Sequence, residues 1–278
     1  MKYYAFIAGL PDLLFEEHKK VYTTEEFKQE LDAILSSSDR KLVNKLFLRY
    51  DNENLLSYLR KGEENMNFNP LAVYSQEEIL EMVEVVKDED RKWNRKYPLY
   101  LEVFINEYLA DEKQDPNMFW EDRLAGLYYD YLRKTRNKFL RQWAELNVNY
   151  RNALIALSCR RNREDYKHLI VGDNEVSKML KEYTNPNLSE YLENYEIIHE
   201  IDEMTDLVAR EQYLDQQLWS WIDEKNTFNY FGIENILGYL FKLQIIERWR
   251  NLNKERGAEI FKEIVYDLKK GVHTLEEF

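Results

Sequence analysis

The sequence predicts an all-α protein. Only 8 of its 278 residues are glycine and 5 are proline, which is too few for the many turns of a β-sandwich or barrel. Leu, Glu, Lys, Arg and Asn are abundant, and this composition favours long helices. The convincing hydrophobic periodicities all have helical spacing, and no linker or low-complexity segment divides the chain. We therefore expect one all-helical body over residues 1–278, large enough to bury a substantial core.

Caps and apolar spacing divide the first third of the chain into short helices. Residues 3–10 fit either a short buried strand or the first turns of a buried helix. Thr24 is the expected cap of a helix that reaches about residue 35, and the polar run 36–39 caps a second helix that ends near Asp51. A segment at 53–61 stops at Gly62, and Ser75 begins a capping box for a helix to about residue 90.

The later elements are longer. A helix follows Pro98 and stops at the break over 114–116. Residues 117–147 contain no proline and a single glycine, so they are predicted to form one helix of roughly 45 Å. An apolar helix at 149–157 ends in a basic run at 160–163, which complements the negative end of the helix dipole. Helices at 189–223, 234–257 and about 258–270 complete the chain. Apolar spacing predicts that Tyr191 and Leu207 are buried in the first of these helices. In the second it predicts a largely buried face of six residues: Ile236, Leu237, Tyr239, Leu240, Ile245 and Trp249.

Charge and cysteine content limit the possible partners and location. The net charge is −13, which disfavours nucleic acid and an anionic bilayer as partners, because both are bound through excess Lys and Arg. A single cysteine, Cys159, excludes an internal disulfide and fits a reducing compartment. The apolar run near the start is too short for a signal peptide, and no run of about 18 apolar residues predicts a membrane span. We expect a cytoplasmic protein that is a monomer when isolated.

Aromatic residues are unusually frequent, with 21 Tyr, 13 Phe and 6 Trp. Their large area and polar tips suit a wide helical core with wet edges. They are also enriched in interface anchors, so a partner-binding surface is the alternative.

A nine-residue pattern near the front of the chain recurs near its end. Glu53 to Lys61 (ENLLSYLRK) and Glu234 to Lys242 (ENILGYLFK) are identical at six of nine positions. A weaker third copy, 151–157, aligns on its asparagine. The three asparagines, Asn54, Asn152 and Asn235, lie 98 and 83 residues apart, which is too long for a short-period solenoid. These intervals suggest three helical lobes with pseudo-threefold repetition, roughly 1–100, 101–190 and 191–278, in an elongated or funnel-like protein. Coincidence between Leu-rich helices is the alternative.

Catalytic signatures are weak in this sequence. It contains neither phosphate-binding glycine motif, no H-E-x-x-H and no cysteine pair. Cys159 with four scattered histidines gives no nucleophile–base signature. The strongest enzyme-like signal is Glu196 with His199, a Glu-x-x-His spacing found in di-metal bundles, with Asp165 and His168 upstream. Polar residues on a helix surface explain the same spacing, and we expect neither a catalytic residue nor a cofactor.

The last third of the chain resembles the C-subunit family of the bacterial and archaeal V-type (A-type) ATPases, whose eukaryotic counterpart carries the letter d. That family has a helix with a pattern close to a-Y-L-x-x-K-E-x-E-I-x-N-L-R before a Gly/Lys turn and a final helix. Matching positions are Gly238-Tyr239-Leu240, Lys242, Ile246, Arg250 and Gly257, with Glu211, Leu214-Asp215 and Gly232-Ile233 upstream. Residues 149–161 and the run Asp51-Asn52-Glu53-Asn54 to Leu59-Arg60 resemble the family's internal D-x-x-N…L-R helix.

Some positions depart from the family pattern. Leu243 and Ile245 replace two acidic residues, and Arg248-Trp249 replaces Asn-Leu. The opening of the chain differs from the usual start of the C-subunit family and is similar to that of an uncharacterised bacterial family associated with V-type ATP synthase gene clusters.

The resemblance implies a non-catalytic role. Members of the C-subunit family are three-lobed helical sockets that receive the rotor shaft of the central stalk and link it to the membrane rotor ring. By this resemblance the partners are other V-type ATPase subunits, and the chain is peripherally associated with the membrane through the complex. A basic edge formed by Arg248, Arg250, Lys254 and Arg256 is the candidate docking surface, and ion pairing with Glu247 and Glu255 is its alternative explanation. Two other functions remain open: a free-standing helical adaptor, and a di-metal carboxylate enzyme that uses Glu196 and His199.

Overall fold

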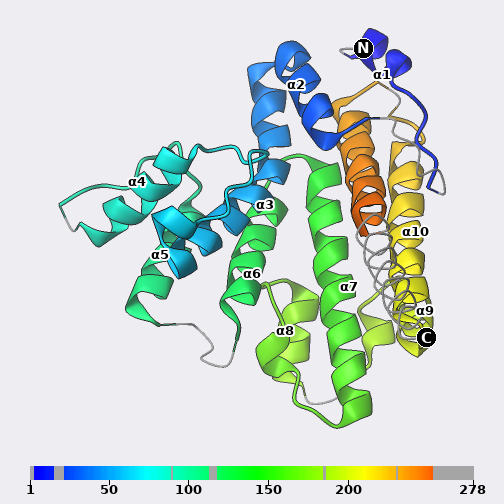
Figure 1. The fold of residues 1–278 in the computed structure, drawn as a ribbon. Coiled ribbons are helices and arrows are strands. Elements are labelled where there is room, and N and C mark those ends of the chain that lie inside the picture. The colour runs from blue at the N-terminus through cyan, green and yellow to red at the C-terminus, as the bar shows by residue number, and fades with distance from the viewer. Residues whose placement is uncertain are drawn as a thin grey trace, which may run out of the picture. The chain divides into compact units, whose positions relative to one another are not determined.

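The structure, a computed structural model, describes residues 3–15, 22–88, 90–112, 118–183, 186–229 and 231–252. These residues form helices joined by turns and contain no strand, so the all-α prediction is confirmed (Figure 1). The ambiguous opening segment is a helix, α1 (Tyr4–Gly9). None of the described helices has a stretch both long and apolar enough to cross a membrane.

The chain divides into two compact units. One contains residues 35–214, and the other combines residues 1–34 with 215–278. The predicted division into three lobes stays a prediction, and each unit is described below by itself.

The unit formed by residues 35–214 is built around two long helices, α3 (Ser37–Lys61) and α7 (Lys138–Asn162). In chain order, neighbouring helices pack on each other from α3 through α7, and α8 and α9 pack on α7. The other elements are α4 (Gln76–Lys87), α5 (Leu99–Ala110), α6 (Trp120–Arg133), α8 (Glu175–Glu182), α9 (Tyr195–Glu203), the start of α10 (Leu207–Asn226), and the 3₁₀ turns η1 (Glu63–Asn65), η2 (Lys167–Leu169) and η3 (Leu188–Glu190).

Two predicted boundaries in this unit are wrong. The helix expected to end near Asp51 continues to Lys61, because Asp51 uses its carboxylate to bind a later loop and leaves the helix backbone intact. The single helix expected over 117–147 is two helices, α6 and α7, separated by residues 134–137. Asn137 caps α7 by accepting a hydrogen bond from the Leu140 N–H at 2.9 Å, and a capping side chain of this kind competes with helix continuation.

The helix predicted over 189–223 is also interrupted. Residues 204–206 separate α9 from α10, and the Asp206 carboxylate accepts from the Val208 and Ala209 N–H groups at 2.8 and 3.2 Å. Asp206 therefore starts α10 in the way that an N-cap does. Tyr191 and Leu207, both predicted to be buried, are exposed.

Aromatic side chains fill much of the core of this unit, and their hydroxyls are bonded. Tyr100 donates to Asn52 Oδ1 at 2.8 Å, and Tyr128 donates to the Lys45 carbonyl at 3.0 Å. Burial raises the pKa of both phenols above their ordinary value. This arrangement agrees with the expected wide helical core with polar edges.

The second unit contains α1, α2 (Thr24–Ile34), the end of α10 and a helix over 233–252. Thr23 rather than Thr24 caps α2, since Thr23 Oγ1 accepts from the Glu26 N–H at 3.0 Å and Glu26 accepts from the Thr23 N–H at 2.8 Å. The predicted core residues of the last described helix, Ile236, Leu237, Leu240, Ile245 and Trp249, are buried. Tyr239 is only half-buried and donates its hydroxyl to the Pro11 carbonyl at 3.1 Å. The helix predicted over 258–270 lies outside the described residues.

Candidate functional site

Two buried asparagines make the same pair of contacts in different helices. Asn54 on α3 accepts from the Asn69 N–H at 2.7 Å and donates to the Asn69 carbonyl at 3.1 Å. Asn152 on α7 accepts from the Val171 N–H at 3.1 Å and donates to the Val171 carbonyl at 2.8 Å. Each amide therefore holds both backbone groups of one residue in the loop that follows its own helix. We call these contacts the Asn54 and Asn152 clamps.

The residue three positions before each clamp holds the start of the next helix. The Asp51 carboxylate accepts from the Val73 and Tyr74 N–H groups, both at 2.9 Å, immediately before the capping box at Ser75. Asn149 Oδ1 accepts at 2.6 Å from the side chain of Asn174, which caps α8. The pairs α3–α4 and α7–α8 are thus two helix–loop–helix modules fixed in the same way.

The modules agree in further details. Both long helices have 25 residues, and each ends at a residue with positive φ, Gly62 at 75° and Arg163 at 61°. Asn235, by contrast, is the third residue of the helix that begins at 233, whereas Asn54 lies near the end of α3. The segments 53–61 and 234–242, which are the more similar in sequence, therefore lie at different places in their helices. The less similar segment 151–157 shares the clamp geometry of 53–61.

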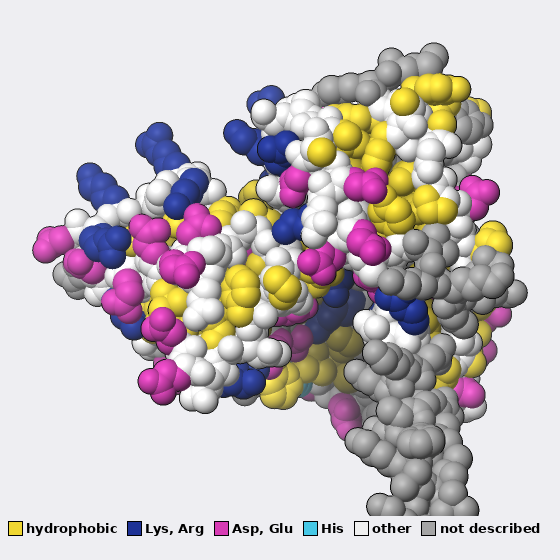
Figure 2. Space-filling model, turned by 45° about the horizontal axis from the view of Figure 1, so that its top comes forward, with side chains coloured by type: hydrophobic (Ala, Val, Ile, Leu, Met, Phe, Trp, Pro, Cys, Tyr) yellow, Lys and Arg dark blue, Asp and Glu magenta, His cyan; other side chains and the backbone are white. Residues whose placement is uncertain are grey.

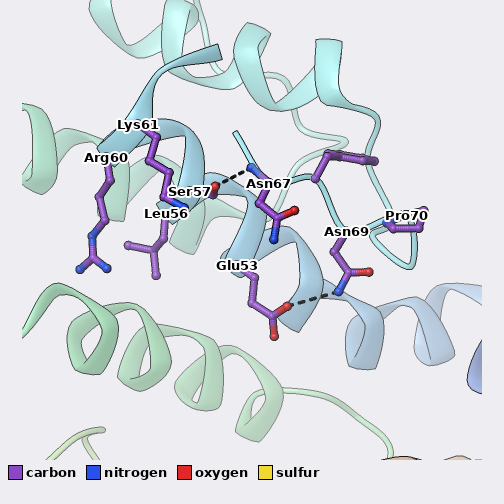
Figure 3. Close-up of a pocket in the computed structure, with 9 residues that line it drawn as sticks. Glu53, Leu56, Ser57, Arg60, Lys61, Asn67, Asn69 and Pro70 are labelled. Carbon is purple, nitrogen blue, oxygen red and sulfur yellow. Dashed lines mark hydrogen bonds between the residues drawn. The ribbon is translucent and has the colours of Figure 1, made fainter. Parts of the chain in front are cut away.

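An open depression of about 600 Å³ lies beside the end of α3 (Figure 3). One wall is the outward face of the first echo segment, and the other is the loop before α4. Its lining residues are Glu53, Leu56, Ser57, Arg60, Lys61, Asn67, Phe68, Asn69 and Pro70. Two hydrogen bonds join the walls: the Asn67 N–H donates to Ser57 Oγ at 2.9 Å and Asn69 Nδ2 donates to Glu53 Oε2 at 3.4 Å. Since the Asn54 clamp fixes Asn69 from behind, it also fixes the shape of the depression.

The lining chemistry of the depression suits docking. It combines one carboxylate, two cations, two side-chain amides and apolar groups, with no His or Cys. Arg60 pairs with Glu121 at 2.5 Å, and this bond raises its pKa above the ordinary value. Lys61 is exposed. A mixed polar and apolar hollow of this kind fits a protruding segment of a partner protein.

The predicted basic edge is engaged within the chain as far as it is described. Arg248 donates to the buried carboxylate of Asp215, and Trp249 Nε1 donates to the same oxygen at 2.7 Å. Arg250 Nη2 lies 3.9 Å from Glu247 Oε1, as the ion-pairing alternative expected. Lys254 and Arg256 lie outside the described residues. Arg248 and Trp249 therefore hold α10 against the helix at 233–252.

The candidate metal ligands do not converge in the described structure. Glu196 and His199 are exposed on α9, and His199 Nδ1 is 3.7 Å from Glu203 Oε1. His168 Nδ1 is 3.9 Å from Asp165 Oδ2. Among the described residues, no group of three or more His, Cys, Asp or Glu side chains could hold a metal ion. Cys159 is buried, and burial raises the pKa of its thiol, which disfavours the reactive thiolate.

A basic cluster that sequence reasoning missed lies at the α6–α7 turn. Lys134, Arg136, Lys138 and Arg141 are all exposed there. The sequence does carry a signal for this cluster, because residues 133–141 contain five cations and no acidic residue. The single-helix interpretation of 117–147 concealed it, because a straight helix would distribute these side chains around its circumference.

Comparison with known proteins assigns the chain to a family. No curated protein and no solved structure matches the chain. Residues 1–272 match the family described as "Protein of unknown function (DUF2764)". The match covers almost the whole chain, and the protein therefore belongs to the DUF2764 family.

Proposed function

We propose that this protein is a non-catalytic socket subunit of a V-type ATPase or ATP synthase, which joins the rotor shaft of the central stalk to the membrane rotor ring. The observation that carries the proposal is the repeated clamp. The D-x-x-N pattern that resembles the C-subunit family occurs as Asp51/Asn54 in α3 and in modified form as Asn149/Asn152 in α7. In both copies the asparagine clamps one residue of the following loop, and the residue three positions before it bonds the start of the next helix. A motif that recurs with one structural role supports descent from a repeated module, as in the C-subunit family.

The construction of the modules suits a part that transmits force. Each long helix has 25 residues, or roughly 37 Å at 1.5 Å per residue. The clamps tie each helix to its following loop through fully buried amides, and such satisfied polar contacts resist slippage. Part-buried ion pairs add further links, since Arg123 bonds Glu107 on α5 at 2.6 Å and Arg151 bonds Asp122 on α6 at 2.5 Å.

The depression beside α3 is the proposed docking point within this function. The Asn54 clamp fixes the loop that forms one of its walls, and Lys61, one of its lining residues, is exposed. A polar loop of a stalk or ring subunit that carries a carboxylate would meet that ammonium group.

Binding of purified components tests the proposal. The full chain is mixed with the purified rotor shaft and ring subunits of the V-type ATPase from the same source, and complexes are measured by size-exclusion chromatography and calorimetry. We expect a complex with a Kd of about 1 μM or tighter. Lys61→Glu should weaken it about tenfold. Lys178→Glu, the same charge change at an exposed position on α8, should not.

The two negative results of this binding experiment lead to different conclusions. If no V-type ATPase subunit binds, the proposal is wrong and the free-standing adaptor is preferred. If a complex forms and Lys61→Glu leaves it intact, the function stands and the docking point lies elsewhere.

A further inference from the structure

The turn between α6 and α7 carries a cluster of exposed cations. Lys134, Arg136, Lys138 and Arg141 are exposed, and no acidic residue occurs between positions 131 and 144. This cluster is unusual for a chain of net charge −13.

Two lysines of α3 extend the cluster. Arg60 pairs with Glu121, whereas Tyr128 bonds the Lys45 carbonyl, so α3 and α6 run antiparallel and the start of α3 lies beside the end of α6. Lys45 Nζ lies 3.7 Å from the centre of the Tyr131 ring, in a cation–π contact. Lys41 lies four residues earlier, one turn along the same side of α3. We define Lys41, Lys45, Lys134, Arg136, Lys138 and Arg141 as the α6–α7 basic surface.

The nearby carboxylates bind Arg133, and the charge of Lys134 also acts on one of them, Asp173. Arg133 binds Asp130, Glu145 and Asp173 at 3.0, 3.1 and 2.7 Å. Within the parts of the chain that the structure describes, no ion pair joins a carboxylate to any of the six cations.

A second basic segment, residues 87–96, provides the contrast. There Lys87 pairs with Glu84, Arg91 lies 3.7 Å from Glu81, and Lys96 pairs with Glu78. Figure 2 shows the mixture over the α4 region at the left, where Lys and Arg side chains alternate with Asp and Glu. That segment balances its own charge, and the α6–α7 basic surface does not.

Fold stability does not explain the α6–α7 basic surface. The first turn of α7 contains no acid, and Lys138 and Arg141 lie at the positive end of the helix dipole, where cations are unfavourable. Mutual repulsion among the six cations adds to this cost. An anionic partner would reverse both effects.

The surroundings identify the class of partner. A membrane-binding surface would combine cations with several exposed apolar anchors. Among the described residues, none of the exposed large apolar side chains lies on α3, α6 or α7, and the exposed Leu99 precedes Tyr100, whose ring centre is 5.2 Å from that of Tyr131. The net charge disfavours a long nucleic acid. We propose that the α6–α7 basic surface binds an acidic surface of a partner protein. This inference does not depend on the ATPase assignment.

Binding of a defined acidic polypeptide tests the inference. Fluorescently labelled poly-L-glutamate is titrated with the full chain at low salt, and anisotropy gives the affinity. A variant combining Lys134→Gln, Arg136→Gln, Lys138→Gln and Arg141→Gln should bind at least about tenfold more weakly. The matched control combines Lys87→Gln, Arg91→Gln, Lys92→Gln and Arg95→Gln, removes the same charge, and should stay within about twofold of wild type. Circular dichroism verifies that both variants are folded.

Three outcomes would overturn the inference. The first is absence of poly-L-glutamate binding, and the second is equal weakening by the two quadruple variants. The third is tighter binding to phosphatidylserine vesicles or to duplex DNA than to poly-L-glutamate, with loss in the 134–141 variant, which would assign the surface to lipid or nucleic acid.

Discussion

At the scale of single residues, the clamps show how one side chain fixes a loop. Asn54 and Asn152 are both fully buried, and each amide satisfies a backbone N–H and a carbonyl that no regular ladder would satisfy. An unsatisfied buried backbone group costs about 1–3 kcal/mol. Each clamp amide therefore contributes more to folding stability through these hydrogen bonds than through the burial of its small apolar area.

Truncation of either clamp measures this effect. Asn54→Ala should lower the free energy of unfolding by about 2–4 kcal/mol, because the N–H and the carbonyl of Asn69 both lose the clamp amide. Asn152→Ala should lower it by about 1–3 kcal/mol, because the Val171 N–H loses its partner while the Val171 carbonyl keeps its bond from Ser177 Oγ. Urea denaturation followed by circular dichroism gives the values. Asn106→Ala is the control, since Asn106 is exposed and bonds only the Glu102 carbonyl within α5; its effect should stay within about 0.5 kcal/mol. A loss as small as that of the control would contradict the clamp.

Asp130 makes one part of the same unit sensitive to pH. Burial, and then its hydrogen bond to Asp173 and the charge of that carboxylate, raise the pKa of Asp130 from 3.8 to about 6. The folded chain therefore holds a proton at this site between those two values, where the unfolded chain has lost it. Protonation thus stabilises the fold at low pH, and this contribution disappears as the pH rises through about 6. The pKa of Asp173 is lowered by its bond to Asp130 and by Arg133, so its own transition lies below this window.

Asp130→Asn should remove this dependence. The amide keeps an oxygen for the Asp173 N–H and for Arg133, and it carries no charge that would need a proton. Relative to the wild type, the variant should gain about 1 kcal/mol as the pH rises from 4 to 7, an amount reduced from the full shift because the site is partly screened. Thermal unfolding across that range measures the difference. Glu64→Gln in the exposed η1 turn should show no such trend, and a pH profile of Asp130→Asn parallel to that of the wild type would refute the assignment.

At the scale of elements, helix ends decide the architecture of the modules. Gly62 ends α3 with φ 75° and ψ 175°, a conformation open essentially only to glycine. An added Cβ would meet no atom within 4 Å, so any cost of substitution comes from the backbone alone.

The matched comparison is Gly62→Ala against Gly9→Ala. Gly9 also has open space around it, but its φ is not positive. Gly62→Ala should destabilise the protein by about 1–3 kcal/mol, and Gly9→Ala should be nearly neutral. Calorimetric unfolding of the two variants measures the difference. Equal effects would show that α3 ends for another reason.

The sequence predicted those element boundaries that carry an explicit local signal. Ser36, Gly62 and the Ser75 capping box were all identified, because a cap or a glycine marks each position. The break at 134–137 was missed, since its residues, Lys-Thr-Arg-Asn, include neither Pro nor Gly. Asn137 is a favoured cap residue and makes a local cap with the Leu140 N–H, but helical spacing on both sides concealed the interruption.

At the scale of the whole molecule, composition was sufficient to predict the all-α class but not to predict the depression beside α3. The apolar positions of the helix at 233–252 were predictable from periodicity, and five of the six named residues are buried. The depression beside α3 was not predictable, because the loop at 67–70 is held there by hydrogen bonds to side chains of α3 that lie 10 to 16 residues earlier. The ion pair of Arg248 was not predictable for a related reason, since Asp215 lies 33 residues before Arg248 in the sequence, and the docking role of Arg248 and Arg250 stays a prediction.

The central claim, that this protein is part of a V-type ATPase, is tested most directly in its native cell. The full chain is tagged at its chromosomal locus, membranes are solubilised in mild detergent, and the purified material is quantified by mass spectrometry. We predict that the rotor shaft and ring subunits co-purify in constant ratio to the tagged chain, and that they are depleted in a strain carrying Asn54→Ala with Asn152→Ala. Recovery of the tagged chain without any ATPase subunit would contradict the account.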